Sequence, residues 1–326
     1  MMRELAANEV RQGIVDAAPE ATRNPVRRWA ADFWLNYLFW HAEHLPWLAR
    51  RTKWFYLWFA FRYSHVIRKA TAANARRIFG PDVSPQRTLA YGRAVMSNFY
   101  EFVYDIGRAL HSTRAQMLAR VEGTAGEHHY DAARALKRGA IVVTAHMGSF
   151  EVGTAALLER DRAVHVVFKR DVRDRFESIR TQMHRRLGVM EAPIDEGWPM
   201  WVRLRDALAR DEIVMLQGDR VMPGQKGVKV PFLHGHLLLP TGPLKLAAAS
   251  GAPIVPVFVL RTSQDKVRVC VEPPILVDPD AAVDENGIHP SLRAMATILE
   301  RYVRDNPEQW LLFHPAFVED SQPEDA

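Results

Sequence analysis

The sequence has a single cysteine, Cys270, among its 326 residues. One cysteine cannot form an intramolecular disulfide, and such scarcity fits a reducing compartment. Cys270 stands in the alternating stretch "KVRVCVEP", which is typical of a strand, so we interpret it as a packed thiol and not as a nucleophile. The opening residues "MMRELAANEVRQG" contain no apolar core and no cleavage site, so no secretory signal peptide is expected.

Long apolar runs are also missing. No uncharged apolar run approaches the roughly 18–20 residues that a membrane-spanning helix needs. The stretch 33–48 comes closest, but it contains Glu43, two histidines and Pro46. If the chain meets a membrane, we therefore expect it to do so at the surface.

Three common site motifs are absent. The segment "GSFEVGT" has the glycine spacing of a phosphate-binding loop but lacks the lysine that should follow, and no G-x-G-x-x-G follows a strand. Ser149 lacks the glycine two residues earlier that a hydrolase nucleophile elbow needs. The "HGH" at 234–236 has no carboxylate at a ligand spacing, so we interpret it as a loop. We expect neither a metal nor a cofactor.

Acidic residues are scarce in the first third of the chain. Composition overall is that of a globular protein, with 48% hydrophobic and 25% charged residues and a net charge of +5. Residues 1–120, however, hold 18 Lys and Arg against 9 Asp and Glu. This concentration of positive charge indicates an anionic partner for the N-terminal third.

A tryptophan-rich segment lies within this basic region. It carries six of the nine tryptophans: Trp29, Trp34, Trp40, Trp47, Trp54 and Trp58. Tryptophan favours the boundary between headgroups and acyl chains, and Lys and Arg are attracted to anionic lipids. We therefore predict one or two amphipathic helices lying on an anionic membrane. An aromatic hairpin packed on the protein's own core is the alternative. Nucleic acid is not expected, because the aromatics fall in apolar clusters such as "WFYLWFAF".

The remaining chain alternates helical and strand patterns. Ser84 and Pro85 open a helical pattern, "AIVVTAH" and "EIVMLQGD" resemble buried strands, and "PSLRAMATILERYVRDNP" is helical again. This alternation predicts an α/β fold with a mainly parallel central sheet and helices on both faces. We expect a flexible extension over 1–25, the interfacial helical segment over 26–80, the α/β domain over 81–318 and a disordered acidic tail over 319–326.

Polar residues follow three of the predicted strands. His146 ends the first, Lys169 and Arg170 end the next, and Asp219 with Arg220 ends "EIVMLQGD". Ligands bind at the carboxyl ends of strands in open α/β sheets, so these side chains are expected to share one cleft.

His146 and Glu151 are the strongest catalytic candidates. Histidine can act as a general base, and a carboxylate on its other nitrogen would orient it. The H-x4-[DE] spacing alone is weak, because it occurs a second time, at His314 and Glu319. Only the first match joins a buried strand to a helix, with Gly148 expected to allow the tight turn. Glu151 also has a simpler interpretation, as an acid favoured in a first helical turn.

The segment "TAHMGSFEVG" resembles the H-x4-[DE] block of the lysophospholipid acyltransferase superfamily, and is closest to the lipid A biosynthesis (lauroyl/myristoyl) acyltransferase branch. The stretches "VFKRDVRDRFESIRTQMHRRLGV", "GDRVMPGQKGVKVPFLHGHLLLPTGPLKLAAASGAPIVPVF" and "NPEQWLLFHPAF" are similar to the later blocks, in order. The resemblance covers roughly residues 85–318.

The resemblance implies a membrane-surface acyltransferase on the cytoplasmic face of a bacterial inner membrane. It would move a fatty acyl chain from acyl carrier protein, or acyl-CoA, to a hydroxyl of a phosphorylated glycolipid, without a covalent intermediate. By motif match His146 is the base and Glu151 its partner, while Lys169, Arg170, Asp219 and Arg220 bind substrate.

Two features leave the acceptor open. Many lipid A enzymes have Asp-Gln where this chain has Asp219-Arg220, and the glycerol-phosphate signature P-E-G-T-R is absent. Another phospholipid or glycolipid acceptor, or a non-catalytic lipid-binding scaffold on the same fold, is the alternative.

Overall fold

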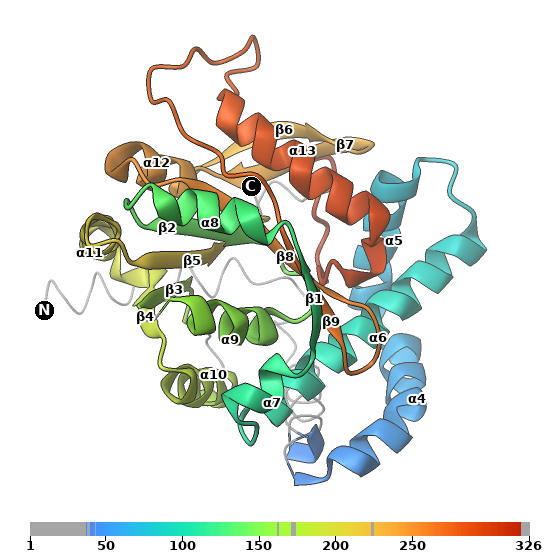
Figure 1. Ribbon diagram of the computed structural model, residues 1–326. Helices are drawn as coiled ribbons and strands as arrows, with labels where there is room; N and C mark the ends of the chain where they lie inside the picture. The colour runs from blue at the N-terminus through green and yellow to red at the C-terminus, as the bar shows by residue number, and fades with distance from the viewer. Residues whose placement is uncertain are drawn as a thin grey trace, which may run out of the picture.

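A parallel-rich sheet organises the molecule. The computed structural model describes residues 37, 40–42, 44–161, 163–170, 174–222 and 225–320. In this part of the chain, seven strands form one sheet in the order β1-β9-β8-β2-β5-β3-β4 (Figure 1). Their bounds are β1 Val121–Ala125, β2 Ala140–Thr144, β3 Val164–Phe168, β4 Met190–Pro193, β5 Ile213–Gln217, β8 Ile254–Arg261 and β9 Val267–Val271.

The strand directions bring the residues of the predicted cleft to one edge of the sheet. Strands β8, β2, β5, β3 and β4 pair in parallel, and the single antiparallel pairing in the described sheet joins β8 to β9. The carboxyl ends of β2, β3 and β5, which are direct neighbours, therefore meet at the same edge. The predicted α/β class with a mainly parallel sheet is confirmed.

The described helices follow the sequence pattern closely. They are α4 Pro46–Tyr63, α5 His65–Phe79, α6 Pro85–Ala109, α7 Arg114–Leu118, α8 Glu127–Ala135, α9 Phe150–Arg160, α10 Asp174–Leu187, α11 Trp198–Ala209, α12 Gly242–Ser250 and α13 Pro290–Asp305. Short 3-10 turns span Ile194–Glu196 and Pro307–Gln309, and the hairpin β6 Gly227–Phe232 and β7 Gly235–Pro240 stands apart from the sheet. Ser84 caps α6 through the backbone N–H of Arg87, and Pro85 is its first residue, as expected.

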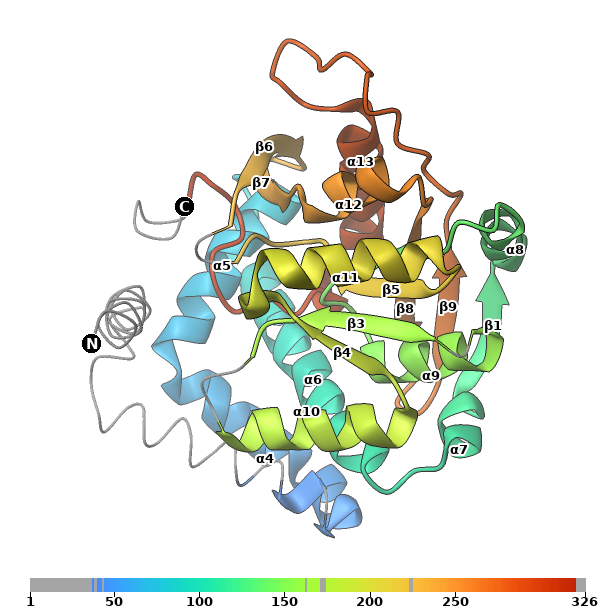
Figure 2. The same cartoon turned by 90° about the vertical axis from the view of Figure 1, so that its left-hand side faces the viewer.

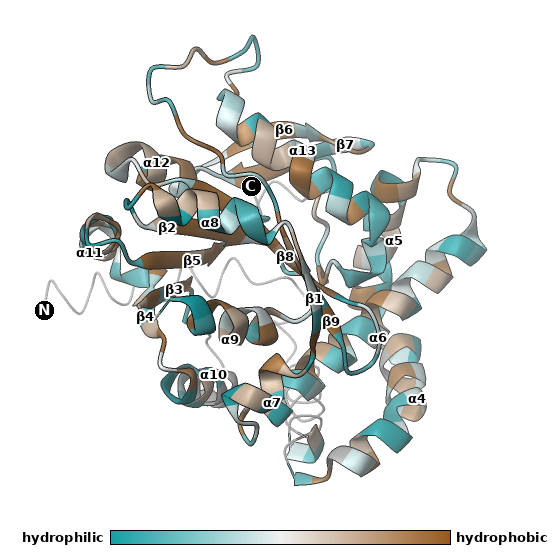
Figure 3. Ribbon diagram, viewed as in Figure 1, coloured by the Kyte–Doolittle hydropathy of each residue, from teal (hydrophilic) through white to brown (hydrophobic). Residues whose placement is uncertain are grey.

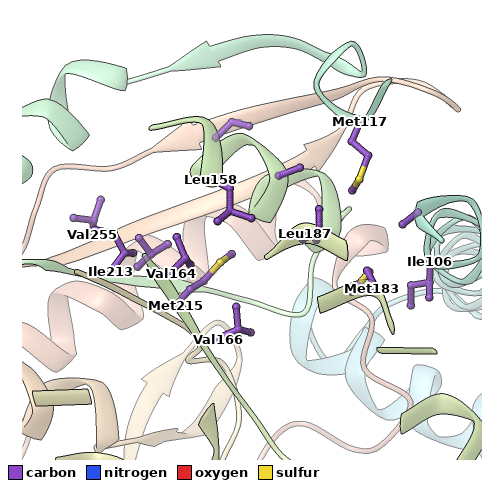
Figure 4. Close-up of a cluster of buried hydrophobic side chains, with 14 of the residues drawn as sticks. Ile106, Met117, Leu158, Val164, Val166, Met183, Leu187, Ile213, Met215 and Val255 are labelled. Carbon is purple, nitrogen blue, oxygen red and sulfur yellow. The ribbon is translucent and has the colours of Figure 1, made fainter. Parts of the chain in front are cut away.

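Helices cover both faces of the sheet. Figure 2 shows α11 on one side of β3 and β4, with α9 and α10 on the other. On the α9 and α10 side, a cluster of buried hydrophobic residues that includes Ile106, Leu158 and Met183 packs between the sheet and the helices (Figure 4). On the α11 side the cluster contains Met200, Leu204 and Leu246. The strands between these layers are strongly hydrophobic (Figure 3), because residues buried on both faces cannot alternate with polar ones.

Helix α4 is the tryptophan-rich helix, and it is docked on α6. The Tyr100 hydroxyl donates to the backbone oxygen of Ala49 at 2.5 Å, and Lys53 pairs with Glu101 at 2.6 Å. Within the residues that the structure describes, no helix is both long enough and apolar enough to span a bilayer.

The first two residues of the predicted acidic tail, Glu319 and Asp320, contact other parts of the fold. Glu319 lies 2.5 Å from the ring of His236, and Asp320 accepts a hydrogen bond from Arg77 at 2.6 Å. These two ion pairs fix the first residues of the segment that the sequence assigned to disorder. Residues 321–326, like 1–36, lie outside the described part of the chain.

Candidate active site

A histidine and an aspartate form the centre of the site. His146 follows β2, and Asp219 follows the adjacent strand β5. The Nδ1 atom of His146 lies 2.7 Å from Oδ1 of Asp219, while its backbone N–H donates to Oδ2 at 3.1 Å. The indole Nε1–H of Trp310 donates to the same Oδ2 at 2.9 Å. Three N–H groups thus hold one fully buried carboxylate.

These contacts keep Asp219 ionised. Burial alone would raise its pKa, but the charge and hydrogen bonds of His146 and the Trp310 indole hold the pKa of Asp219 well below its usual range. An ionised acceptor at Nδ1 selects the tautomer with the proton on that nitrogen. The other ring nitrogen, Nε2, is then left as a base, and His146 lines a large cavity.

A tight turn connects His146 to α9. Gly148 has φ of +62°, and a Cβ built there would lie 1.7 Å from the backbone oxygen of Val259. The same loop is fixed by Leu311, whose N–H donates to the oxygen of His146 at 2.8 Å, and by a bridge between Met147 and Trp310. The predicted role of Gly148 in the turn is confirmed, because no other residue fits this backbone.

Glu151 lies in the first turn of α9 and also lines the cavity. It is only 3% exposed, and its Oε2 has no hydrogen-bond partner among the described residues. Burial raises the pKa of Glu151 to about 7. The sequence assigned Glu151 as the carboxylate partner of His146. In the structure Asp219 occupies that position, because parallel pairing of β2 and β5 brings the two strand ends together.

The cavity spans both layers of the fold. Its volume is about 1530 Å³. One wall comes from the α6, α9 and α10 side and is mainly apolar, with residues Phe99, Phe102, Ile106, Phe150, Val166 and Met183. Arg180 and His184 of α10 also line the cavity. The opposite wall comes from the α11 and α12 side and mixes apolar with polar groups, including Trp198, Trp201, Arg205, Leu216, Lys245 and Leu246. His146 and Glu151 lie in the lining between them, beside Gly148 and Phe150.

The predicted cationic residues are brought to this cavity. Lys169, Arg170 and Arg220 all line it, together with Lys226 and Lys245. Arg170 also pairs at the rim with Asp195 and with Glu196, the latter at 3.1 Å. Asp219, predicted to bind substrate, is instead fully buried behind His146, and it is not part of the cavity lining within the described chain.

Sequence reasoning missed two parts of the site. Trp310 lies in "NPEQWLLFHPAF", whose family resemblance marked the segment without giving this side chain a role. The sequence of α6 shows only an amphipathic pattern. Such a pattern predicts that its aromatic residues are buried, but it does not predict that they line this cavity. Neither contact has a local spacing that a single sequence could reveal.

Fold and site together define a mainly parallel α/β protein with a histidine–carboxylate pair beside a large cavity, which has a mainly apolar wall and several cationic side chains in its lining. A family model described as bacterial lipid A biosynthesis acyltransferase matches residues 23–319. The chain belongs to this family of acyltransferases.

Two similar curated proteins are the phosphatidylinositol mannoside acyltransferases of two Mycobacterium tuberculosis strains, H37Rv and CDC 1551. Each is 27% identical over 190 residues, which is 56% of this chain and 58% of the relative. The match therefore spans a little over half the length of these relatives.

Proposed function

We propose that the protein transfers a fatty acyl group from a carrier thioester to a hydroxyl of a phosphorylated glycolipid at a membrane surface. The observation that carries this proposal is the His146–Asp219 pair at the wall of a cavity with apolar and cationic sides. Family membership and the glycolipid named in the relatives' descriptions support the same reaction class.

His146 is the general base in this proposal. Its Nε2 takes the proton of the acceptor hydroxyl as that oxygen attacks the thioester carbonyl. Asp219 stabilises the resulting imidazolium without becoming protonated. When the tetrahedral intermediate collapses, the carbon–sulfur bond breaks and the imidazolium returns the proton to the departing thiolate. One ester and one free thiol are formed, and no covalent acyl-enzyme is required.

Glu151 is proposed as a second catalytic group with a different role from the one predicted. A carboxyl with a pKa of about 7 carries a proton in a large share of molecules at neutral pH. Such a carboxyl can donate a hydrogen bond to the carbonyl oxygen as negative charge develops there. The absence of an ion-pair partner on Oε2, within the described residues, supports a proton-donating role.

The two cavity walls suit the two ends of an amphiphile. The apolar wall of α6, α9 and α10 would hold the acyl chain, since burial of each methylene is favourable by about 0.8 kcal/mol. Arg220, Lys226 and Lys245 would bind the phosphate of the acceptor. At about 1530 Å³ the cavity exceeds the roughly 300–1,000 Å³ of a pocket for one small molecule, which leaves room for donor and acceptor together.

Helix α4 is proposed as the surface that meets the membrane. Trp47, Trp54 and Trp58 are 63%, 72% and 55% exposed, so these rings are not packed in the core. Their spacing places them on one helical face, where exposed Arg51 and Arg62 also lie. This combination suits an anionic bilayer, and we place the enzyme on the cytoplasmic face of a bacterial inner membrane.

The remaining predicted tryptophans add less to this surface. Trp40 is 42% exposed and precedes α4, whereas Trp29 and Trp34 lie outside the described residues.

The test is a direct assay of acyl transfer. Purified protein is incubated with labelled acyl carrier protein or acyl-CoA and with a lipid A precursor or a phosphatidylinositol mannoside. Labelled product is then identified by mass spectrometry. We expect product with wild type and none with His146→Ala, while full activity of the alanine variant would exclude the mechanism. Lipid binding without product in every arm would favour the non-catalytic scaffold.

A further inference from the structure

A buried ionic cluster contacts Ser149, which lies between His146 and Glu151 in the sequence. Its centre is Asp105 on α6, which is 2% exposed. Arg261 donates to Oδ2 of Asp105 at 2.6 Å, and Arg120 forms an ion pair with Oδ1 at 2.7 Å. The hydroxyl of Ser149 donates to Oδ2 at 3.0 Å. Ser149 is itself fully buried and lies between the two candidate catalytic residues.

This cluster ties together segments that are distant in sequence. Arg261 ends β8, Arg120 precedes β1, and Ser149 precedes the first residue of α9. The backbone of Arg261 also exchanges two hydrogen bonds with the side chain of Gln309, at 2.7 and 2.9 Å. Gln309 precedes Trp310, which donates to Asp219. Asp105 is therefore connected to the His146 loop through Ser149, and to the Asp219 side through Arg261 and Gln309.

The cluster also sets which carboxylate the arginines neutralise. Charged groups that act on Glu151 are Asp105 on α6, Arg261 on β8 and Arg120 before β1. Both guanidinium groups contact Asp105, whereas Oε2 of Glu151 has no partner in the described chain. Burial is the largest influence on the pKa of Glu151 and raises it; Asp105 adds to this effect, and the two arginines oppose it.

Stability alone is a weak reason for this arrangement. Buried ion pairs lose hydration on folding and are often no better than apolar residues of the same volume. Three buried charges beside a fourth, unpaired carboxyl are instead typical of a site where protonation matters.

We propose that Asp105 is a positioning residue of the acyl-transfer site: it anchors the catalytic loop through Ser149 and engages Arg120 and Arg261, so that Glu151 is left without an ion pair. This inference rests on the proposed function for its effect on turnover. Its effect on Glu151 is independent of that function and can be measured without any substrate.

The first experiment follows the ionisation of Glu151 in the full-length protein. Carbon-13 NMR of glutamate-labelled protein gives the titration midpoint, and the Glu151→Gln spectrum assigns the signal. In Asp105→Asn the arginines lose their carboxylate and act on Glu151, so its midpoint moves to lower pH. Arg120→Gln removes one cation and moves the midpoint to higher pH. Unchanged midpoints in both variants would overturn the proposal.

The second experiment separates anchoring from charge. Ser149→Ala removes the hydrogen bond from Ser149 to Asp105 without altering any charge. We therefore expect kcat to fall roughly tenfold to a hundredfold, while KM and the titration midpoint of Glu151 stay constant. Wild-type turnover in Ser149→Ala would refute the anchoring role. Arg268→Gln is the control, because this exposed arginine pairs with Glu122 on the outer strands.

A variant that does not fold, and a protein that lacks the proposed activity, can each be distinguished from a failure of this inference. Thermal unfolding reports whether Asp105→Asn folds, and if it does not, Arg120→Gln and Ser149→Ala carry the test. If the wild type transfers no acyl group to any acceptor, the proposed function fails, yet the NMR midpoints still decide whether Asp105 governs Glu151.

Discussion

The Nδ1 atom of His146 and the Oδ1 atom of Asp219 lie 2.7 Å apart, although 73 positions separate the two residues in the sequence. Parallel pairing of β2 with β5 brings these strand ends together, and Trp310 fixes the carboxylate from a third segment. The local H-x4-[DE] spacing predicted Glu151 as the partner of His146, whereas the carboxylate that lies against its Nδ1 atom is Asp219.

Asp219→Asn tests this partnership. An amide at this position loses the negative charge that stabilises the imidazolium and can favour the wrong histidine tautomer. We expect kcat to fall roughly a thousandfold to ten-thousandfold, with acceptor KM little changed. The control is Asp284→Asn, in an exposed loop where Asp284 pairs with Arg293. Comparable turnover in the two variants would contradict the assignment.

Glu151→Gln tests the raised pKa through stability. The folded-state pKa of about 7 exceeds the unfolded value of about 4.3, so the folded protein binds this proton more tightly. The contribution to the free energy of unfolding is fully present below the unfolded pKa and is lost as pH rises through 7. It amounts to about 4 kcal/mol.

Chemical denaturation from pH 4 to 8 should therefore give a flatter stability curve for Glu151→Gln than for wild type. Asp219, with its lowered pKa, contributes the opposite slope, but it is present in both proteins and cancels in the difference. Parallel curves for the two proteins would show that Glu151 titrates normally. In activity assays we expect Glu151→Gln to exceed Glu151→Ala, because the amide keeps a hydrogen-bond donor.

The exposed tryptophans of α4 predict a loss of vesicle binding. Replacing Trp47, Trp54 and Trp58 with alanine removes the aromatic face while the contacts of α4 with α6 remain. Co-sedimentation with anionic vesicles should fall roughly tenfold or more. A matched control replaces exposed Leu276 and Val283 with alanine, away from this helix. Equal binding by both variants would assign membrane contact to another surface.

The cationic wall predicts a selective effect on the acceptor. Arg220→Gln and Lys245→Gln should each raise acceptor KM roughly tenfold, with kcat and donor KM nearly constant, because a charged hydrogen bond to phosphate is lost. With a dephosphorylated acceptor, wild type and variants should behave alike. Lys229→Gln, on the exposed face of β6, is the control. A change in donor KM alone would place the donor at this wall.

Gly148→Ala should destabilise the fold strongly. An added Cβ would lie 1.7 Å from the Val259 oxygen, and the φ of +62° is unfavourable for alanine. We expect a loss of about 3 kcal/mol or more in the free energy of unfolding. Gly188→Ala measures the cost of the left-handed backbone alone, because φ there is +78° and nothing lies within 4 Å of the added Cβ. This control should lose only about 1–2 kcal/mol.

The sequence predicted the sheet, most helices and the residues at three strand ends because these depend on short-range patterns. Buried runs such as "AIVVT" indicate parallel strands, and Gly148 stands where a turn is needed. The strand order does not follow from such patterns, so the contact of His146 with Asp219 was not predictable. The same holds for Asp105, which looks like an ordinary acid on a helix until β8 and Ser149 pack against it.

The indole of Trp310 completes the hydrogen bonds of Asp219 from a position 91 residues later in the sequence. Synthesis proceeds from the N-terminus, so His146 and Asp219 emerge well before the residue that fixes their geometry. A chain that lacks residue 310 thus contains the histidine and the aspartate without the indole that holds the carboxylate in place.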